Sequence, residues 1–150
     1  MRSRSDRMIR GASMALGLAL ALLDPAATRG DDNAVSAAND ASKPFVVKIH
    51  ADWCGTCQML GPVIDALDAE MGSSVCIVVL DVTNRETALA AADEAKRLGI
   101  EPFFERYRSK TGTVGVLDGS TREIVAVLSG EFDLAAYERA VARANPRTGA

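Results

Sequence analysis

The stretch ADWCGTC at residues 51–57 separates two segments with different hydrophobic patterns. Before it, the run FVVKI at residues 45–49 is short and rich in β-branched residues, which predicts a strand. After it, apolar residues recur at helical spacing through residues 58–71, which predicts an amphipathic helix. The two cysteines of the stretch, Cys54 and Cys57, are therefore expected where a strand ends and a helix begins.

That position has consequences for the chemistry of the cysteine pair. The N-terminus of a helix carries unpaired N–H groups and the positive end of the helix dipole, and both favour a thiolate over a thiol. The thiolate is the species that attacks a disulfide, and two intervening residues let the second sulfur reach the first within one helical turn. We therefore expect Cys54 to attack a partner disulfide and Cys57 to resolve the mixed disulfide. A structural disulfide and part of a metal site are the alternative interpretations.

The rest of the chain alternates between strand and helix patterns. A near-continuous apolar run at residues 75–82 predicts a strand buried on both faces, as in the middle of an α/β sheet. The further elements expected are a helix at 83–98 with Thr83 and Glu86 as its capping box, a short helix at 101–110, strands at 113–117 and 123–128 joined by a turn at 118–119, and a closing helix at 132–144. This order predicts an α/β fold with a mixed central β-sheet and helices on both faces.

The first thirty residues differ from the rest of the chain. Residues 1–10 are basic, and residues 11–23 form an apolar run shorter than the roughly 20 residues that span a bilayer, a pattern typical of a secretory signal peptide. An uncleaved membrane anchor or a wrongly assigned start codon is the alternative. We expect a signal peptide or N-terminal anchor at 1–30, a linker or short helix at 31–42, and one domain at 43–145. The protein is then periplasmic or otherwise exported.

The charge distribution and the cysteine content exclude several classes of function. Residues 1–30 carry five basic and two acidic residues, whereas the remainder carries twelve basic and eighteen acidic ones. The remainder is therefore net acidic and lacks the clustered positive charge with which proteins bind nucleic acid. One close cysteine pair does not match a disulfide-stapled mini-protein, and with His50 as the single histidine it does not make a four-ligand zinc site. Cys76 lies in an apolar strand pattern and is expected to be a buried small hydrophobe.

The strand, the stretch Ala51-Asp52-Trp53-Cys54-Gly55-Thr56-Cys57 and the helix with Pro62 near its start resemble the thioredoxin superfamily, whose hallmark is an A-x-W-C-x-x-C loop in this place. The resemblance extends more loosely over residues 43–144, and Lys43-Pro44 is most similar to the exported, thiol-reducing branch. It implies a thioredoxin-like fold and a thiol–disulfide oxidoreductase that reduces protein disulfides through the cysteine pair. The oxidising bias of an exported space calls for a membrane partner as electron donor. We expect a monomer that uses no cofactor.

Three features depart from the family's pattern. Gly112 stands where the family has a cis-proline packed against the cysteines, which puts substrate docking and the exclusion of metal in question. Lys48 stands where many members carry a buried acidic residue; a buried lysine either pairs with an acid or loses its proton, and when charged it could stabilise a thiolate. Alternatively, Lys48 extends to the surface. Residues 101–110 resemble an insertion that could cover the site or bind a partner, or simply pack as a helix.

Two further residues are candidates for supporting roles. Trp53 is expected to form an aromatic wall over the cysteine pair. His50 could tune the pKa of the cysteines or help to bind a metal, although a histidine at the outer end of a strand needs no function. Two other functions remain open on the sequence. One is a module that binds a soft metal such as Cu(I) through Cys54, Cys57 and His50, and the other is a redox-inert interaction domain.

Overall fold

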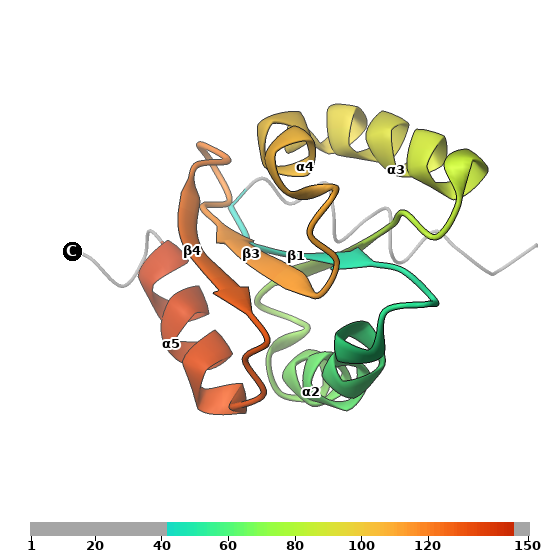
Figure 1. The fold of residues 1–150 in the computed structure, drawn as a ribbon. Helices are drawn as coiled ribbons and strands as arrows, with labels where there is room; N and C mark the ends of the chain where they lie inside the picture. The colour runs from blue at the N-terminus through green and yellow to red at the C-terminus, as the bar shows by residue number, and fades with distance from the viewer. Residues whose placement is uncertain (1–41, 146–150) are drawn as a thin grey trace, which may run out of the picture.

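The computed structural model describes residues 42–145, in which a four-stranded sheet lies between two layers of helices (Figure 1). The predicted export segment at 1–30 and nearly all of the linker at 31–42 lie outside the described residues. Along the chain the elements are β1 (Phe45–His50), α2 (Gly55–Met71), β2 (Cys76–Asp81), α3 (Arg85–Leu98), α4 (Glu101–Tyr107), β3 (Thr113–Leu117), β4 (Ile124–Ser129) and α5 (Leu134–Ala144).

The sheet has the strand order β2-β1-β3-β4, so β1 lies in its interior. Strands β1 and β2 are parallel and are joined through α2, whereas β3 is antiparallel to both β1 and β4. The mixed sheet predicted from the sequence is thereby confirmed. Because parallel neighbours end at the same edge of a sheet, the loop that leaves β1 and the loop that leaves β2 meet at the carboxyl ends of these strands.

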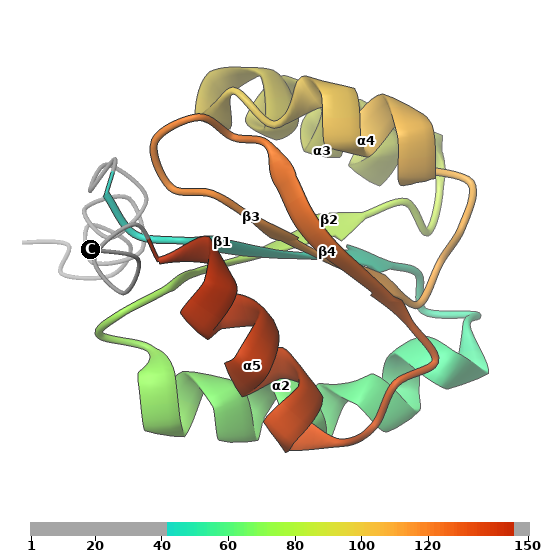
Figure 2. The same cartoon turned by 90° about the vertical axis from the view of Figure 1, so that its left-hand side faces the viewer.

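Helices cover both faces of the sheet, as predicted (Figure 2). Helices α3 and α4 lie on one face, and α2 and α5 lie on the other. The alternation of side chains along β1 divides the core between the two layers. Phe45, Val47 and Ile49 pack in the cluster under α3 and α4, and Val46 packs in the cluster with α2 and α5. Lys48, two residues after Val46, therefore lies on the α2 and α5 face.

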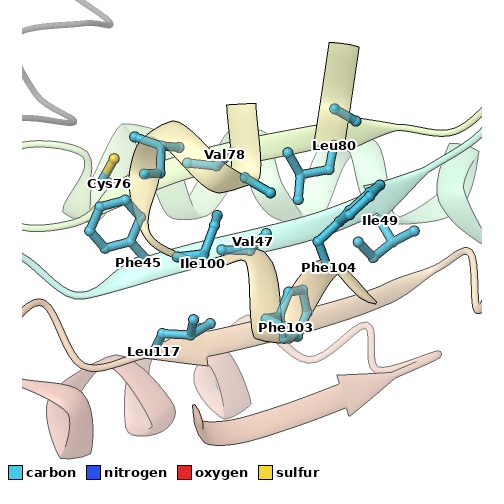
Figure 3. Packing of buried hydrophobic residues seen from close by; sticks show 13 residues of the cluster. Phe45, Val47, Ile49, Cys76, Val78, Leu80, Ile100, Phe103, Phe104 and Leu117 are labelled. Atoms are coloured by element: carbon cyan, nitrogen blue, oxygen red, sulfur yellow. The ribbon is translucent and has the colours of Figure 1, made fainter. Parts of the chain in front are cut away.

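Helix α4 packs into the core instead of standing apart from it. Phe103 and Phe104 are each 1% exposed and belong to the cluster on the α3 and α4 face, where Phe104 lies next to Ile49 and Phe103 lies near Val47 (Figure 3). The ring of Phe103 lies directly over Gly115 of β3, in space that any larger residue at position 115 would fill. Of the interpretations offered for residues 101–110, the structure therefore bears out the packed helix.

The start of α3 differs from the prediction. The N-cap is Asn84, whose side chain accepts the backbone N–H groups of Glu86 and Thr87, and Thr87 completes the capping box by accepting the N–H of Asn84. The predicted box of Thr83 with Glu86 is wrong because the Thr83 hydroxyl donates to Asp81 and is committed to the preceding loop. Helix α2 also begins earlier than predicted, at Gly55 directly after Cys54.

Within residues 42–145, no helix has both the length and the apolar character required to cross a membrane.

The contact between Phe103 and Gly115 predicts a strong effect of a small substitution. In Gly115→Ala the new Cβ would lie 2.6 Å from Cζ of Phe103, so the buried ring must move and the fold should lose about 1–3 kcal/mol of stability. Gly55→Ala is the control, because its Cβ would meet nothing within 4 Å and should change stability by less than about 0.5 kcal/mol. Urea unfolding of both variants measures the difference, and equal stabilities would contradict this account of α4.

Candidate active site

Cys54 and Cys57 are joined in a disulfide at the start of α2, with their Cα atoms 5.2 Å apart. Cys54 is the N-cap of α2, and its Sγ accepts the backbone N–H of Cys57 at 3.2 Å. Its carbonyl also accepts the N–H groups of Cys57 and Gln58, so the first turn of the helix is built on this residue. When the disulfide is reduced, an N–H group and the positive end of the helix dipole act on the sulfur of Cys54, and both favour its thiolate.

The two cysteines differ in their access to solvent. Cys54 is 8% exposed and Cys57 is 1% exposed, and both pack against Ala51 and the partly buried Val82. The Sγ of Cys57 lies 3.7 Å from the carbonyl oxygen of Ile49 at the end of β1. A sulfur from another molecule can therefore approach Cys54 more readily than Cys57, which is the order of events predicted from the sequence.

The loop between β1 and α2 is held by the loop that follows β2. The N–H of Asp52 donates to the hydroxyl of Thr83 at 2.9 Å, and the indole N–H of Trp53 donates to the carbonyl of Thr83 at 3.1 Å. Thr83 in turn donates to Asp81 through its backbone N–H and its hydroxyl, and these hydrogen bonds from Thr83 hold the pKa of the Asp81 carboxyl below its usual range. The sequence assigned Thr83 to a helix cap and not to this site, although its position just after a strand parallel to β1 indicates that it lies near the loop.

Trp53 is predominantly exposed, at 67%, and so is Met59 in the first part of α2, at 58%. The indole is fixed at one end by its hydrogen bond to Thr83. Trp53 therefore presents a large apolar surface next to Cys54 in the chain, in an orientation that the loop determines. Its role as a wall over the disulfide stays a prediction.

Gly112 lies against the disulfide, in the place that the family resemblance implied. A Cβ on Gly112 would be 3.7 Å from Sγ of Cys54 and 3.0 Å from Cγ2 of Thr56. Its φ is +79°, and its N–H donates to the carbonyl of Ile49 at 2.9 Å. A proline has φ near −65° and no N–H. This glycine therefore supplies a conformation and a donor that the family's proline does not.

Lys48 is buried, at 6% exposure, and its Nζ donates to the carbonyl of Cys57 at 2.9 Å. The interpretation that this side chain extends to the surface is wrong, because the hydrogen bond holds it between β1 and the start of α2. Burial lowers the pKa of Lys48, and the charge of Asp65 opposes this effect without cancelling it. The structure thus places a lysine amine directly beside the second cysteine.

His50 lies at the outer end of β1 and is directed toward Asp52, with Nε2 3.2 Å from Oδ1. Its Nδ1 is buried and lacks a hydrogen-bond partner. Among residues 42–145, no three His, Cys, Asp or Glu side chains gather as a possible metal site, so the structure does not bring His50 together with the two cysteines as ligands. The third cysteine, Cys76, is buried in β2, and burial raises the pKa of its thiol.

Comparison with known proteins decides the family. The family model described as Thioredoxin matches residues 27–106, which is more than half of the chain. The chain belongs to the thioredoxin family. A redox-active cysteine pair in a thioredoxin-family chain identifies a thiol–disulfide oxidoreductase, and the α/β architecture is the thioredoxin-like fold expected from the sequence.

Three thioredoxins illustrate how far the similarity extends. The H-type thioredoxin of Chlamydomonas reinhardtii is 26% identical over 98 residues, covering 65% of this chain and 83% of that protein. The thioredoxin of Porphyra purpurea is 38% identical over 80 residues, covering 53% of this chain and 74% of that protein. The thioredoxin of Bacillus subtilis is 54% identical over 39 residues, which are 25% of this chain and 38% of that protein.

The geometry of Gly112 predicts that the family's proline does not fit this chain. Gly112→Pro removes the N–H that Ile49 accepts and cannot adopt φ of +79°, so it should destabilise the oxidised protein by more than about 2 kcal/mol. Gly112→Ala keeps the N–H. It should lose about 1–2 kcal/mol through its left-handed conformation, and slightly more because Thr56 must shift to admit the new Cβ. Guanidinium unfolding of the two variants tests this ranking. A proline variant as stable as the wild type would show that the glycine conformation is not required.

Proposed function

We propose that this protein reduces disulfides in other proteins, in the periplasm or an equivalent exported space. The observation that carries the proposal is the difference between the cysteines: Cys54 caps α2 and is the more accessible, and Cys57 is enclosed. The Cys54 thiolate attacks a substrate disulfide, one substrate sulfur leaves as a thiolate, and a mixed disulfide forms. Cys57 then attacks Cys54, the second substrate sulfur leaves, and the intramolecular disulfide forms.

We also propose where the protein acts, what reduces it again and in which oligomeric state it works. The basic and apolar pattern of residues 1–23 supports export of the chain. An exported reductant must be returned to its dithiol form against an oxidising bias, which calls for a membrane partner that supplies electrons. Both cysteines and the residues around them come from one chain, so we infer that a monomer suffices for the reaction.

The first test is the redox equilibrium of the cysteine pair. Purified protein is equilibrated in dithiothreitol or glutathione buffers, and the fraction of disulfide is measured by thiol alkylation. We expect a two-electron transition closer to about −270 mV, the value of a reductant such as thioredoxin, than to about −120 mV, the value of a strong oxidant. A transition near the oxidant's value would contradict reduction as the direction, and the absence of any transition would contradict the redox function.

The second test identifies substrates and compartment together. In Cys57→Ser the mixed disulfide on Cys54 cannot be resolved, so the full chain expressed in bacterial cells should accumulate adducts that dithiothreitol releases. We expect the trapped proteins, identified by mass spectrometry, to be exported ones with cysteines. Cys54→Ser/Cys57→Ser is the control and should trap none. Adducts made only with cytoplasmic proteins would contradict the proposed location, and a lack of adducts would contradict attack by Cys54.

A further inference from the structure

Lys48 occupies an unusual place for a charged side chain. Its neighbours across the sheet are Val79 on β2 and Val114 on β3, and it shares its face with Val46. The side chain is 6% exposed, and the carbonyl of Cys57 is the group that accepts its hydrogen bond. Thr113 is the other polar or charged residue that is buried in the described part of the chain. The lysine is therefore an exception to an otherwise apolar interior.

An ammonium in this position is costly in the oxidised protein. Burial of a charge without an ionic partner is unfavourable, and one hydrogen bond to a neutral carbonyl offsets only part of the cost. No salt bridge to Lys48 occurs among residues 42–145. Asp65 is exposed, and its charge favours the ammonium less than burial disfavours it. The disulfide itself is neutral and contributes no compensating charge.

Reduction of the disulfide changes this balance. The carbonyl oxygen of Cys57 lies 2.9 Å from Nζ of Lys48, and the sulfur belongs to the same residue, so reduction can place a negative charge near the ammonium. Opposite charges near one another interact strongly in a buried, weakly polar environment. The cost of burying Lys48 is thus offset in the reduced protein and not in the oxidised one.

We propose that Lys48 is a positioning residue that stabilises the thiolate of Cys57. It thereby favours the dithiol form at equilibrium, and it raises the fraction of Cys57 that is ionised when this residue attacks the mixed disulfide. This inference rests on the proposed function and adds to it what sets the redox equilibrium of the pair. Cys57 enters the step as a thiolate and gives its electron pair to Cys54. The bond between Cys54 and the substrate sulfur breaks, and that sulfur leaves as a thiolate and takes a proton from water.

The redox equilibrium with glutathione tests the proposal at pH 7. Lys48→Met has similar volume and no charge, so the equilibrium constant should shift about tenfold toward the disulfide, which corresponds to about 30 mV more negative. Lys96→Met removes an exposed lysine on α3 and should match the wild type. Lys48→Arg keeps a charge and should lie within about threefold of the wild type if the charge is what matters.

A direct titration separates this effect from a structural one. Thiolate absorbance of Cys57 is followed in the Cys54→Ser/Cys76→Ala background, with and without Lys48→Met. The pKa of Cys57 should rise when the lysine is lost, because the thiolate then lacks the nearby positive charge. If Lys48→Met does not fold, as judged by circular dichroism, Lys48→Gln keeps a donor to Cys57 without the charge and should show the same shift.

The outcomes distinguish the inference from the function on which it rests. A wild-type protein with no disulfide–dithiol transition would refute the proposed function. A wild-type transition that Lys48→Met and Lys48→Gln leave equal to that of Lys96→Met would refute the role of Lys48 alone. A tenfold shift together with a raised pKa of Cys57 would support it.

Discussion

One hydrogen bond, from the backbone N–H of Cys57 to the sulfur of Cys54, ties the chemistry of this protein to its fold. The sulfur of Cys54 caps the N-terminus of α2 and is also the nucleophile that attacks the substrate disulfide, so the helix and the nucleophile cannot be positioned independently. This arrangement requires that α2 begin only a few residues after the end of β1. The turn that joins them is closed by the N–H of Cys54 donating to the carbonyl of Ala51 at 3.0 Å. The loops around it serve to keep this junction in place.

The junction is supported from two sides that are distant in sequence. On one side, Thr83 binds the backbone of Asp52 and the indole of Trp53. On the other, Gly112 donates to the carbonyl of Ile49 and lies against Thr56. Each support comes from a loop at an edge of the sheet that the topology brings to the carboxyl end of β1. A rigid support of this kind lets the cysteines cycle between bonded and free states without rebuilding the helix.

The strands and helices could be predicted from the sequence because their signals are local. The apolar run that contains Cys76 predicts β2, and the helical spacing after Cys57 predicts α2. Each of these patterns lies within the one element that it predicts. The cap of α3 was assigned to Thr83 because Thr83 and Asn84 are both good capping residues, and only the fold shows that Thr83 is already bound to Asp81. Choices of this kind depend on partners from other elements, and one sequence does not reveal them.

In the candidate site too, some features follow from local sequence and others depend on contacts between distant elements. The placement of Cys54 and Cys57 followed from a motif of adjacent residues, and the location of Gly112 followed from family resemblance. The positive φ of Gly112 and its bond to Ile49 depend on how β3 enters the sheet, which no motif encodes. For Lys48, the sequence left burial and exposure both open. Its side chain packs against a helix on one side and strands on the other, and such a position is known only once both are placed.

The ring of Phe103 and the bare backbone of Gly115 fit together so closely that neither position can be understood alone. In evolutionary terms the two residues are epistatic. A lineage that gains a side chain at 115 must first replace the ring at 103, and one that loses the ring leaves a void that a larger residue at 115 can fill. Homologues of this chain should therefore carry a large residue at one of the two positions and a small residue at the other.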